Sequence, residues 1–382
     1  MKKLRLILFA LGILLLTRAS QADWTPAKRL TWTSGKSSVP AVAADSNGAV
    51  HIVWEDNTPG NSEIYYKRSP DGGTTWAAAQ RLTWNSGESV FPAIAIDSGN
   101  TIHVVWQDST LGIDEIYYTR SSDGGLTWSA VRRLTWTSGS SGGPNIAIDS
   151  SPAIHIVWMD YTPSNYEVYY TNSMDAGLTW GTAKRLTWTT TSSFYPVIAS
   201  YSTHYVHVVW YDDTSGNLEV YYKRSWDRGS TWGTAKRLTV NSGWSSYPFV
   251  ATGSIGDIHI VWQDNTPGNQ EIYYRRSTDG GSNWDTVRRL TWTSGWSYFP
   301  AIGIDSNDDI HIVWHDDTPG DSEIYYKSSL DGGSTWSATQ RLTWMSGSSV
   351  YPAMAIGTGD ALHLVWSDGT PGNYELYYKK GT

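Results

Sequence analysis

The sequence contains no cysteine among its 382 residues. A disulfide framework, a thiolate metal site and a cysteine nucleophile are therefore excluded. Charged residues are also scarce, at 17%, whereas 36 glycines, 23 tryptophans and 24 tyrosines are present. So many glycine and aromatic residues are not typical of a helical bundle. A hydrophobic fraction of 40% is equally untypical of a disordered chain.

Basic residues are fewer than acidic ones, with 28 lysines and arginines against 36 aspartates and glutamates. An acidic surface disfavours nucleic acid and anionic membranes as partners. A basic start, an apolar run from Leu6 to Leu16 and small residues at Ser20 and Ala22 predict a signal peptide over residues 1–22. Removing its four positive charges changes the net charge from −8 to −12. We expect a soluble mature chain, 23–382, that is secreted, periplasmic or held at the cell surface.

The dominant feature is an internal repeat of 52 residues. Arg-Leu-Thr recurs at this spacing, at Arg29, Arg81, Arg133, Arg185, Arg237, Arg289 and Arg341. A proline, a histidine, a Trp-x-Asp triplet and a Glu-x-Tyr-Tyr segment recur in the same phase. A fixed period near 50 is typical of a solenoid or a propeller. Each repeat carries four short strand-like segments between turn residues, which favours a propeller.

The repeats predict an all-β fold, a seven-bladed β-propeller of four-stranded antiparallel blades in a single domain. The chain ends after the third strand of the last repeat, so Ala27–Trp32 can supply the fourth strand of blade seven and close the ring. The predicted blades cover about residues 40–84, 92–136, 144–188, 196–240, 248–292, 300–344, and 352–380 with 23–32.

A turn motif, Ser-x-Asp-[GAR]-Gly-x-[TN]-Trp, lies between the third and fourth segments. Its aspartates are Asp71, Asp123, Asp175, Asp227, Asp279 and Asp331. The motif resembles the Asp-box, or BNR repeat, of sialidase-like propellers, over nearly the whole predicted mature chain. Its aspartate can accept backbone N–H bonds across a tight turn, and its glycine can adopt a positive φ. In the resembling families this turn lies opposite the active site, which implies a structural role.

Other recurring residues have structural interpretations. We expect His51 and its six equivalents to form hydrogen bonds between blades, and the tryptophans at repeated positions to lie in the core. Asp56 and its equivalents are expected to accept N–H groups of the following turn, with a ligand or calcium contact as the alternative. Glu63 and its equivalents are expected to pair with the repeated arginine or the backbone. His204 and His315 depart from the repeat and are expected at the surface.

The resemblance implies that two loop types form the functional face, as at residues 33–39 and 55–62. Departures from the repeat in such loops gather five aromatic residues in blades five and six. These candidate ligand-binding residues are Trp244, Tyr247, Trp296, Tyr298 and Phe299. Two interpretations remain open, namely stacking on sugars or peptide side chains, and packing between neighbouring loops to close the rim.

The positions of the arginines show whether a sialidase-type active site can be present. Sialidases of the resembling family hold the substrate carboxylate with three arginines and use a Tyr–Glu pair with an aspartic acid. Every arginine of the predicted mature chain falls on a third or fourth strand or, at Arg228, in an Asp-box. The family's Arg-Ile-Pro motif is absent, and the family has six blades. Repeated carboxylates have similar environments, whereas a catalytic pair needs unlike ones. No catalytic residue is therefore assigned.

The sequence thus favours an exported, monomeric, non-catalytic binding module whose first-choice ligand is a carbohydrate, with a protein ligand as the other partner. Seven similar blades suit repeated weak contacts. We predict no metal, no cofactor, no nucleic-acid partner and no membrane insertion. Two alternatives stay open: a sialidase-like glycoside hydrolase, and a structural or protein-interaction scaffold of the cell envelope.

Overall fold

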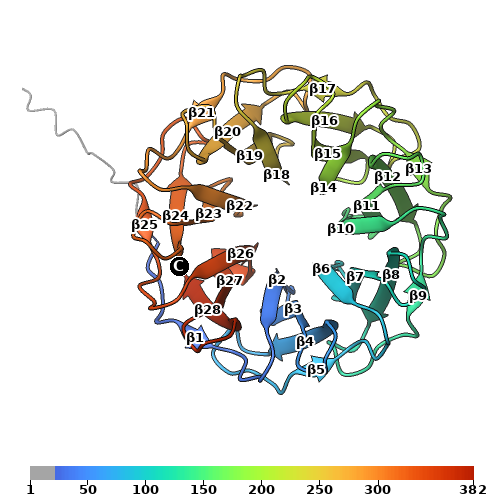
Figure 1. The fold of residues 1–382 in the computed structure, drawn as a ribbon, viewed down its shortest axis with the longest axis vertical. Helices are drawn as coiled ribbons and strands as arrows, with labels where there is room; N and C mark the ends of the chain where they lie inside the picture. The colour runs from blue at the N-terminus through green and yellow to red at the C-terminus, as the bar shows by residue number, and fades with distance from the viewer. Residues whose placement is uncertain (1–21) are drawn as a thin grey trace, which may run out of the picture.

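The computed structural model describes residues 22–382, so the predicted signal peptide lies outside it except for Ala22. Within this range 28 strands form seven separate four-stranded antiparallel sheets, arranged as blades around a central axis (Figure 1). The one helical segment of residues 22–382 is a short 3-10 turn, η1 (Thr358–Asp360). The prediction of an all-β, seven-bladed propeller is confirmed.

Six blades are each made of four consecutive strands, from the axis outward (Figure 1). The first contains β2 (Ser37–Ala44), β3 (Val50–Asp56), β4 (Glu63–Ser69) and β5 (Gln80–Arg81). The second and third contain β6 (Ser89–Ile96), β7 (Ile102–Asp108), β8 (Glu115–Ser121), β9 (Arg132–Arg133), β10 (Ser141–Ile148), β11 (Ile154–Asp160), β12 (Glu167–Ser173) and β13 (Lys184–Arg185). The fourth and fifth contain β14 (Ser193–Tyr201), β15 (Tyr205–Asp212), β16 (Glu219–Ser225), β17 (Lys236–Arg237), β18 (Ser245–Thr252), β19 (Ile258–Asp264), β20 (Glu271–Ser277) and β21 (Arg288–Arg289). The sixth contains β22 (Ser297–Ile304), β23 (Ile310–Asp316), β24 (Glu323–Ser329) and β25 (Gln340–Arg341).

The seventh blade is built from both ends of the described chain. Its strands are β26 (Ser349–Ile356), β27 (Leu362–Asp368), β28 (Glu375–Gly381) and β1 (Lys28–Arg29). β1 pairs antiparallel with β28, with Lys28 opposite Tyr378. The N-terminal strand therefore closes the ring, as the repeat phase predicts.

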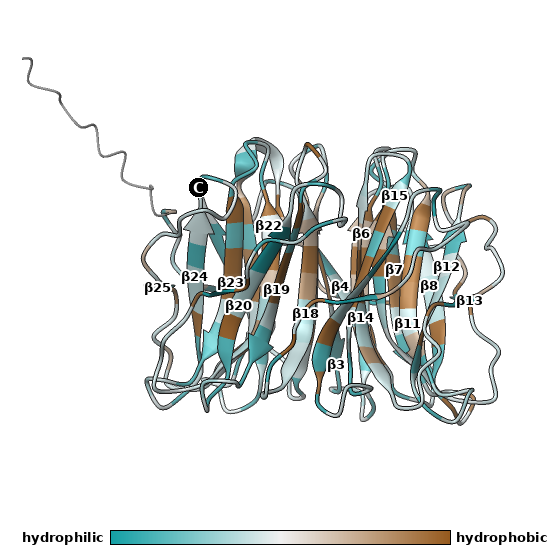
Figure 2. Ribbon diagram, turned by 90° about the horizontal axis from the view of Figure 1, so that it is seen from above, coloured by the Kyte–Doolittle hydropathy of each residue, from teal (hydrophilic) through white to brown (hydrophobic). Residues whose placement is uncertain are grey.

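The hydrophobic core lies between blades. Val53 and Ile64 of the first blade pack in one cluster with Ile102 and Trp106 of the second. Because each middle strand is covered by neighbouring blades, its apolar residues occur in near-continuous runs (brown in Figure 2). The tryptophans of Trp-x-Asp are buried in every blade, as predicted.

The repeated histidines bond within blades, which corrects the expectation of bonds between blades. His51 Nε2 lies 3.3 Å from Asp45 Oδ2, and His51 Nδ1 lies 2.7 Å from the Tyr66 hydroxyl on the neighbouring strand. A carboxylate only accepts, so Nε2 carries the proton and Nδ1 accepts from the Tyr66 hydroxyl, whose oxygen also lies 3.3 Å from the Gly124 carbonyl of the second blade. Tyr66 supplies the link between blades, because its ring packs edge-on against Trp128 of the second blade, at 5.0 Å.

The six Ser-x-Asp turns share one hydrogen-bond pattern. In the first, Asp71 accepts the Thr75 backbone N–H at 2.7 Å and the Thr75 hydroxyl at 2.6 Å. These bonds lower the pKa of Asp71 to about 2. Gly73 has a φ of 92° and donates to the Ser69 hydroxyl. We call the face that carries these turns and the end of β28 the turn face, and the opposite one the loop face.

Candidate functional site

A β-bulge in each innermost strand places one residue at the wall of the central channel. The register between β2 and β3 shifts between Ser38 and Ala41, and the intervening residue before the proline has a positive φ. The same positive φ occurs in all seven blades, at Val39, Phe91, Gly143, Tyr195, Tyr247, Phe299 and Tyr351. Six of these residues are not glycine, so the packing of the bulge outweighs the steric cost of the left-handed region. The ring is near the loop-face end of the channel, because innermost strands begin there.

Five aromatic side chains dominate this ring. The centroids of Tyr195 and Tyr247 are 5.4 Å apart, those of Tyr247 and Phe299 are 4.6 Å apart, and those of Phe299 and Tyr351 are 5.1 Å apart. Phe91 lies 6.5 Å from Tyr195. These residues line a cavity of about 560 Å³ together with the prolines and the mostly apolar residues that follow them. The chain thus presents a contiguous aromatic lining in its channel.

The variable residue of Trp-x-Asp supports the bulge of the following blade. The side-chain oxygen of Gln263 accepts the Phe299 N–H at 3.0 Å, and that of Gln107 accepts the Gly143 N–H at 3.1 Å. Glu55 takes the same role with Phe91 at 3.3 Å and also accepts the Ser38 hydroxyl at 3.0 Å. Burial raises the pKa of the Glu55 carboxyl above its ordinary value.

His315 occupies this variable position in the sixth blade and corrects the expectation of a surface residue. Its side chain is buried, and its ring lies 5.5 Å from each of Tyr298 and Phe299. Burial lowers the pKa of His315 to about 3, so the imidazole is neutral at physiological pH. Tyr211 holds the equivalent place in the fourth blade and stacks on Tyr195.

Sequence reasoning placed His315 at the surface and did not single out Tyr211, Glu55 or the two glutamines. The available signal was the single variable residue inside the otherwise constant Trp-x-Asp triplet. Sequence reasoning used that triplet only for its two constant members.

The five sequence-predicted aromatic residues divide into separate groups. Tyr247 and Phe299 contact each other in the channel ring. Trp296 and Tyr298 form a second pair at 5.6 Å, and His315 joins this pair to Phe299. Trp244 stands apart and is 56% exposed, and Trp296 is 47% exposed. Some of these rings pack together and close the channel rim, as one interpretation predicts. The two indoles face solvent, as the ligand-stacking interpretation requires.

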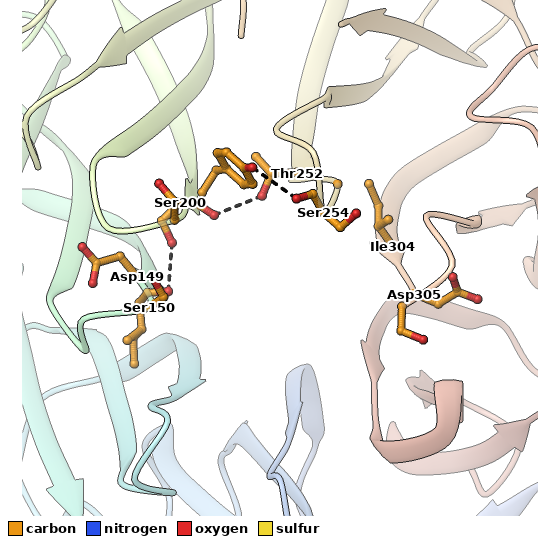
Figure 3. A pocket seen from close by; sticks show the side chains of 12 residues that line it. Asp149, Ser150, Ser200, Thr252, Ser254, Ile304 and Asp305 are labelled. Atoms are coloured by element: carbon orange, nitrogen blue, oxygen red, sulfur yellow. Dashed lines mark hydrogen bonds between the residues drawn. The ribbon is translucent and has the colours of Figure 1, made fainter.

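The turn-face end of the channel has a different chemistry. A second cavity of about 490 Å³ is lined there mainly by polar groups from blades three to six, including Asp149, Ser150, Ser254 and Asp305 (Figure 3). The Ser200 hydroxyl of the fourth blade donates to the Ile148 carbonyl of the adjacent third blade. The channel is thus aromatic near the loop face and polar at the turn face.

The arginines are engaged away from the loop-face mouth. Arg81 donates to Glu63 at 2.7 Å, and the same ion pair recurs in every blade. Several others bond carbonyls of the turn face, such as Arg132 to Leu178 and Arg288 to Ser334. Within residues 22–382, no three arginines converge on a loop-face site. The predicted pairing of Glu63 with the repeated arginine is confirmed.

Asp56 binds its turn as predicted. Its carboxylate accepts the Thr58 N–H at 2.9 Å and the Ser37 hydroxyl at 2.6 Å. In the described part of the chain, no group of three or more histidines, aspartates and glutamates is placed to hold a metal ion. Residues 22–382 also include no helix with the length and apolarity needed to cross a membrane.

Six tryptophans expected in the core are instead exposed. They follow Leu-Thr in the outermost segment of a blade, and their exposed fractions are 68–70%. These residues, which we call the outer tryptophan belt, are Trp32, Trp84, Trp136, Trp188, Trp292 and Trp344. The fourth blade has Val240 at this position, 79% exposed. The outermost strands pair over only two residues, so no further strand covers the indole that follows.

Comparison with known proteins identifies the fold alone. No family model and no curated protein matches the sequence. An ulvan lyase of a new polysaccharide lyase family has a TM-score of 0.63 at 11% identity, over 92% of this chain and 95% of that chain. A protein of unknown function from Dyadobacter fermentans gives 0.57 at 12% identity over 93% and 98%. A Hadza microbial sialidase gives 0.55 at 14% identity over 86% and 76%. These neighbours share the β-propeller fold with this chain at 11–14% sequence identity.

Proposed function

We propose that the chain is a non-catalytic carbohydrate-binding module, exported by its N-terminal segment, whose site is the loop-face mouth of the channel. The aromatic arrangement there carries the proposal. Trp296 and Tyr298 are paired at this mouth and are coupled through His315 to Phe299 of the ring. Sugars present an apolar C–H face that packs on aromatic rings, and polar edges that need a few hydrogen-bond partners.

The charges at the mouth favour neutral sugars. Glu55 lies beside the ring, where burial disfavours its ionised form, and its nearby charges, Lys36 and Glu88, are of opposite sign. An anionic sugar would need a bidentate cationic anchor, and the described arginines are engaged elsewhere. The structural neighbours include enzymes named for carbohydrate substrates, which supports a carbohydrate ligand without specifying one.

A glycan array tests this proposal. The mature chain is expected to bind neutral glycans, and the double variant Trp244→Ala/Trp296→Ala is expected to lose at least tenfold in affinity, an order-of-magnitude figure for two exposed aromatic contacts. Trp226→Ala is the matched control, because Trp226 is 46% exposed but belongs to a turn-face motif. Equal binding by the double variant and the wild type would remove the site from this mouth.

A sialidase-like hydrolase is the alternative favoured by the neighbours that are sialidases. Turnover of a fluorogenic sialoside or of a neutral glycoside panel by the purified chain would establish it. We expect no turnover, because the described structure has no arginine cluster for the substrate carboxylate.

A further inference from the structure

The outer tryptophan belt is a surface separate from the channel mouth. Each indole follows the outermost strand of its blade. Trp84 lies at the level of the loop-face end of β4, because the next residue, Asn85, donates its N–H to Glu63 at the start of that strand. Large exposed aromatic side chains are unfavourable in water and are typical of binding surfaces. Six near-identical copies indicate a partner with repeated features.

Every belt indole lies beside the guanidinium of an arginine from its own blade, and hydrogen bonds hold this guanidinium in place. Arg81 lies 5.8 Å from the Trp84 ring, and the other five distances are 5.5–5.8 Å. Its Nε donates to the Thr83 carbonyl at 2.6 Å and its Nη2 to Glu63 at 2.7 Å. The Arg81 guanidinium also hydrogen-bonds the Tyr65 side chain. The arginine is therefore already ordered beside the indole, at the partly exposed surface where a ligand can reach it.

A second cation reaches some of these sites from the next blade. Lys67 Nζ lies 5.9 Å from the Trp32 ring, and Lys223 Nζ lies 5.3 Å from the Trp188 ring. Both are held by carbonyls of the preceding blade, Lys67 by Leu30 at 2.6 Å and Lys223 by Leu186 at 2.7 Å. Since a buried glutamate balances the arginine, the lysine leaves these sites with a local positive charge on an acidic protein.

The sequence around the indoles argues against insertion into lipid. Trp32 lies between Thr31 and Thr33, and Trp84 between Thr83 and Asn85. A membrane-surface anchor combines tryptophan with aliphatic residues that enter the acyl region. Isolated indoles among hydroxyl and amide groups suit a polar partner with apolar faces, which is the chemistry of a sugar ring.

We propose that the outer tryptophan belt binds an acidic polysaccharide. Each indole stacks on the C–H face of a sugar ring, and the neighbouring guanidinium donates to a carboxylate or sulfate of the chain. Six sites around the ring bind one polymer with an avidity that far exceeds the affinity of a single site. This inference is independent of neutral-glycan binding at the channel mouth, because the two surfaces share no residue.

Affinity electrophoresis of the mature chain in gels containing dextran sulfate, with uncharged dextran as the matched polymer, tests the inference. We expect retardation by dextran sulfate only. Trp84→Ala is expected to weaken binding roughly two- to fivefold, and Trp→Ala at all six belt positions by at least about 100-fold. These variants keep every arginine, so a loss reports stacking and not charge. The double variant Trp244→Ala/Trp296→Ala is expected to be retarded like the wild type.

Two further variants make the test specific. Trp226→Ala is the control, since Arg224 lies 4.8 Å from that exposed indole on the turn face. Val240→Trp is expected to add a seventh site and to strengthen binding, because Arg237 already bonds Glu219 and the Thr239 carbonyl. The inference is overturned if the six-fold variant is retarded like the wild type, if dextran binds as well as dextran sulfate, or if Val240→Trp has no effect. Tryptophan-dependent sedimentation with phosphatidylcholine–phosphatidylglycerol vesicles but no retardation by dextran sulfate would also overturn it, in favour of a membrane surface.

Discussion

The imidazole of His315 stacks on the ring of Phe299, with 5.5 Å between centroids and 20° between planes. Phe299 has a φ of 46°, a value that places it in the left-handed region. Gln263 of the preceding blade binds its N–H. The strained bulge is therefore held from two sides, by a hydrogen bond from one blade and by ring packing within its own blade. This makes the aromatic lining a rigid part of the fold, which suits a preformed binding surface.

The buried histidines should make the protein sensitive to mild acid. Burial lowers the pKa of His315 and of His207 to about 3 and that of His259 to about 4, whereas an unfolded histidine titrates near pH 6.5. The folded pKa is the lower one, so this contribution to stability is complete above pH 6.5 and is lost as the pH falls toward 4. Carboxylates with lowered pKa values, such as Asp71, change the stability only at lower pH, where they become protonated.

Differential scanning calorimetry between pH 7 and pH 4 should show a falling Tm. His315→Phe should make the Tm less dependent on pH. The variant lacks one buried imidazole, so it takes up about one proton fewer on unfolding than the wild type. His204→Phe is the control, since His204 is exposed, and its dependence should equal that of the wild type. An unchanged slope in His315→Phe would contradict the buried, neutral state of this histidine.

Glu55→Gln should stabilise the protein at neutral pH. The pKa of Glu55 is raised by burial, so the folded state disfavours the ionised form that the unfolded state adopts above pH 4.5. Glutamine already fills the equivalent position at Gln107 and Gln263 and accepts the same type of backbone N–H. We expect the free energy of unfolding to rise by roughly 0.5–1 kcal/mol at pH 7 and not at pH 4, measured by urea denaturation. A decrease at pH 7 would show that the ionised carboxylate is needed in the fold.

The repeat alone was sufficient to predict the propeller, the blade number and the closure by β1. A period of 52 residues in constant phase identifies equivalent positions, and the phase of the two chain ends then fixes which strand completes the last blade. That two residues occupy repeated positions does not reveal whether their side chains are buried or exposed. Trp84 and Trp106 are both repeated, yet Trp106 is covered by two blades and Trp84 lies beyond the last paired strand. His315 is buried by Phe299 and Tyr351, and the bulge that brings them together is not visible in the sequence.

Gly73 should be intolerant of substitution because its turn packs against the neighbouring blade. Its φ is 92°, and a Cβ there would overlap the Tyr378 hydroxyl. Gly60 has a φ of 114°, but a Cβ added to it would meet no atom of residues 22–382 within 4 Å, so it isolates the backbone effect. Gly73→Ala should lower the free energy of unfolding by about 3 kcal/mol and Gly60→Ala by about 1 kcal/mol, measured by urea denaturation. Equal losses would show that the turn can move away from Tyr378.

Leu30 and Leu82 allow the chain-end closure to be compared with an ordinary blade. Both follow the repeated arginine and are buried, Leu30 against Trp54 and Leu376, and Leu82 against Tyr66 and Trp106. Either change to alanine removes similar packing, so each should lower the free energy of unfolding by about 2–4 kcal/mol.

The two sites should differ in kinetics. Leu82 is joined covalently to its blade through residues 70–79, whereas Leu30 is held to β28 only by non-covalent contacts across the chain ends. Leu30→Ala should therefore accelerate unfolding more than Leu82→Ala, as measured by stopped-flow dilution into urea, because release of β1 opens the ring. Identical unfolding rates would mean that the ring does not open first at the seventh blade.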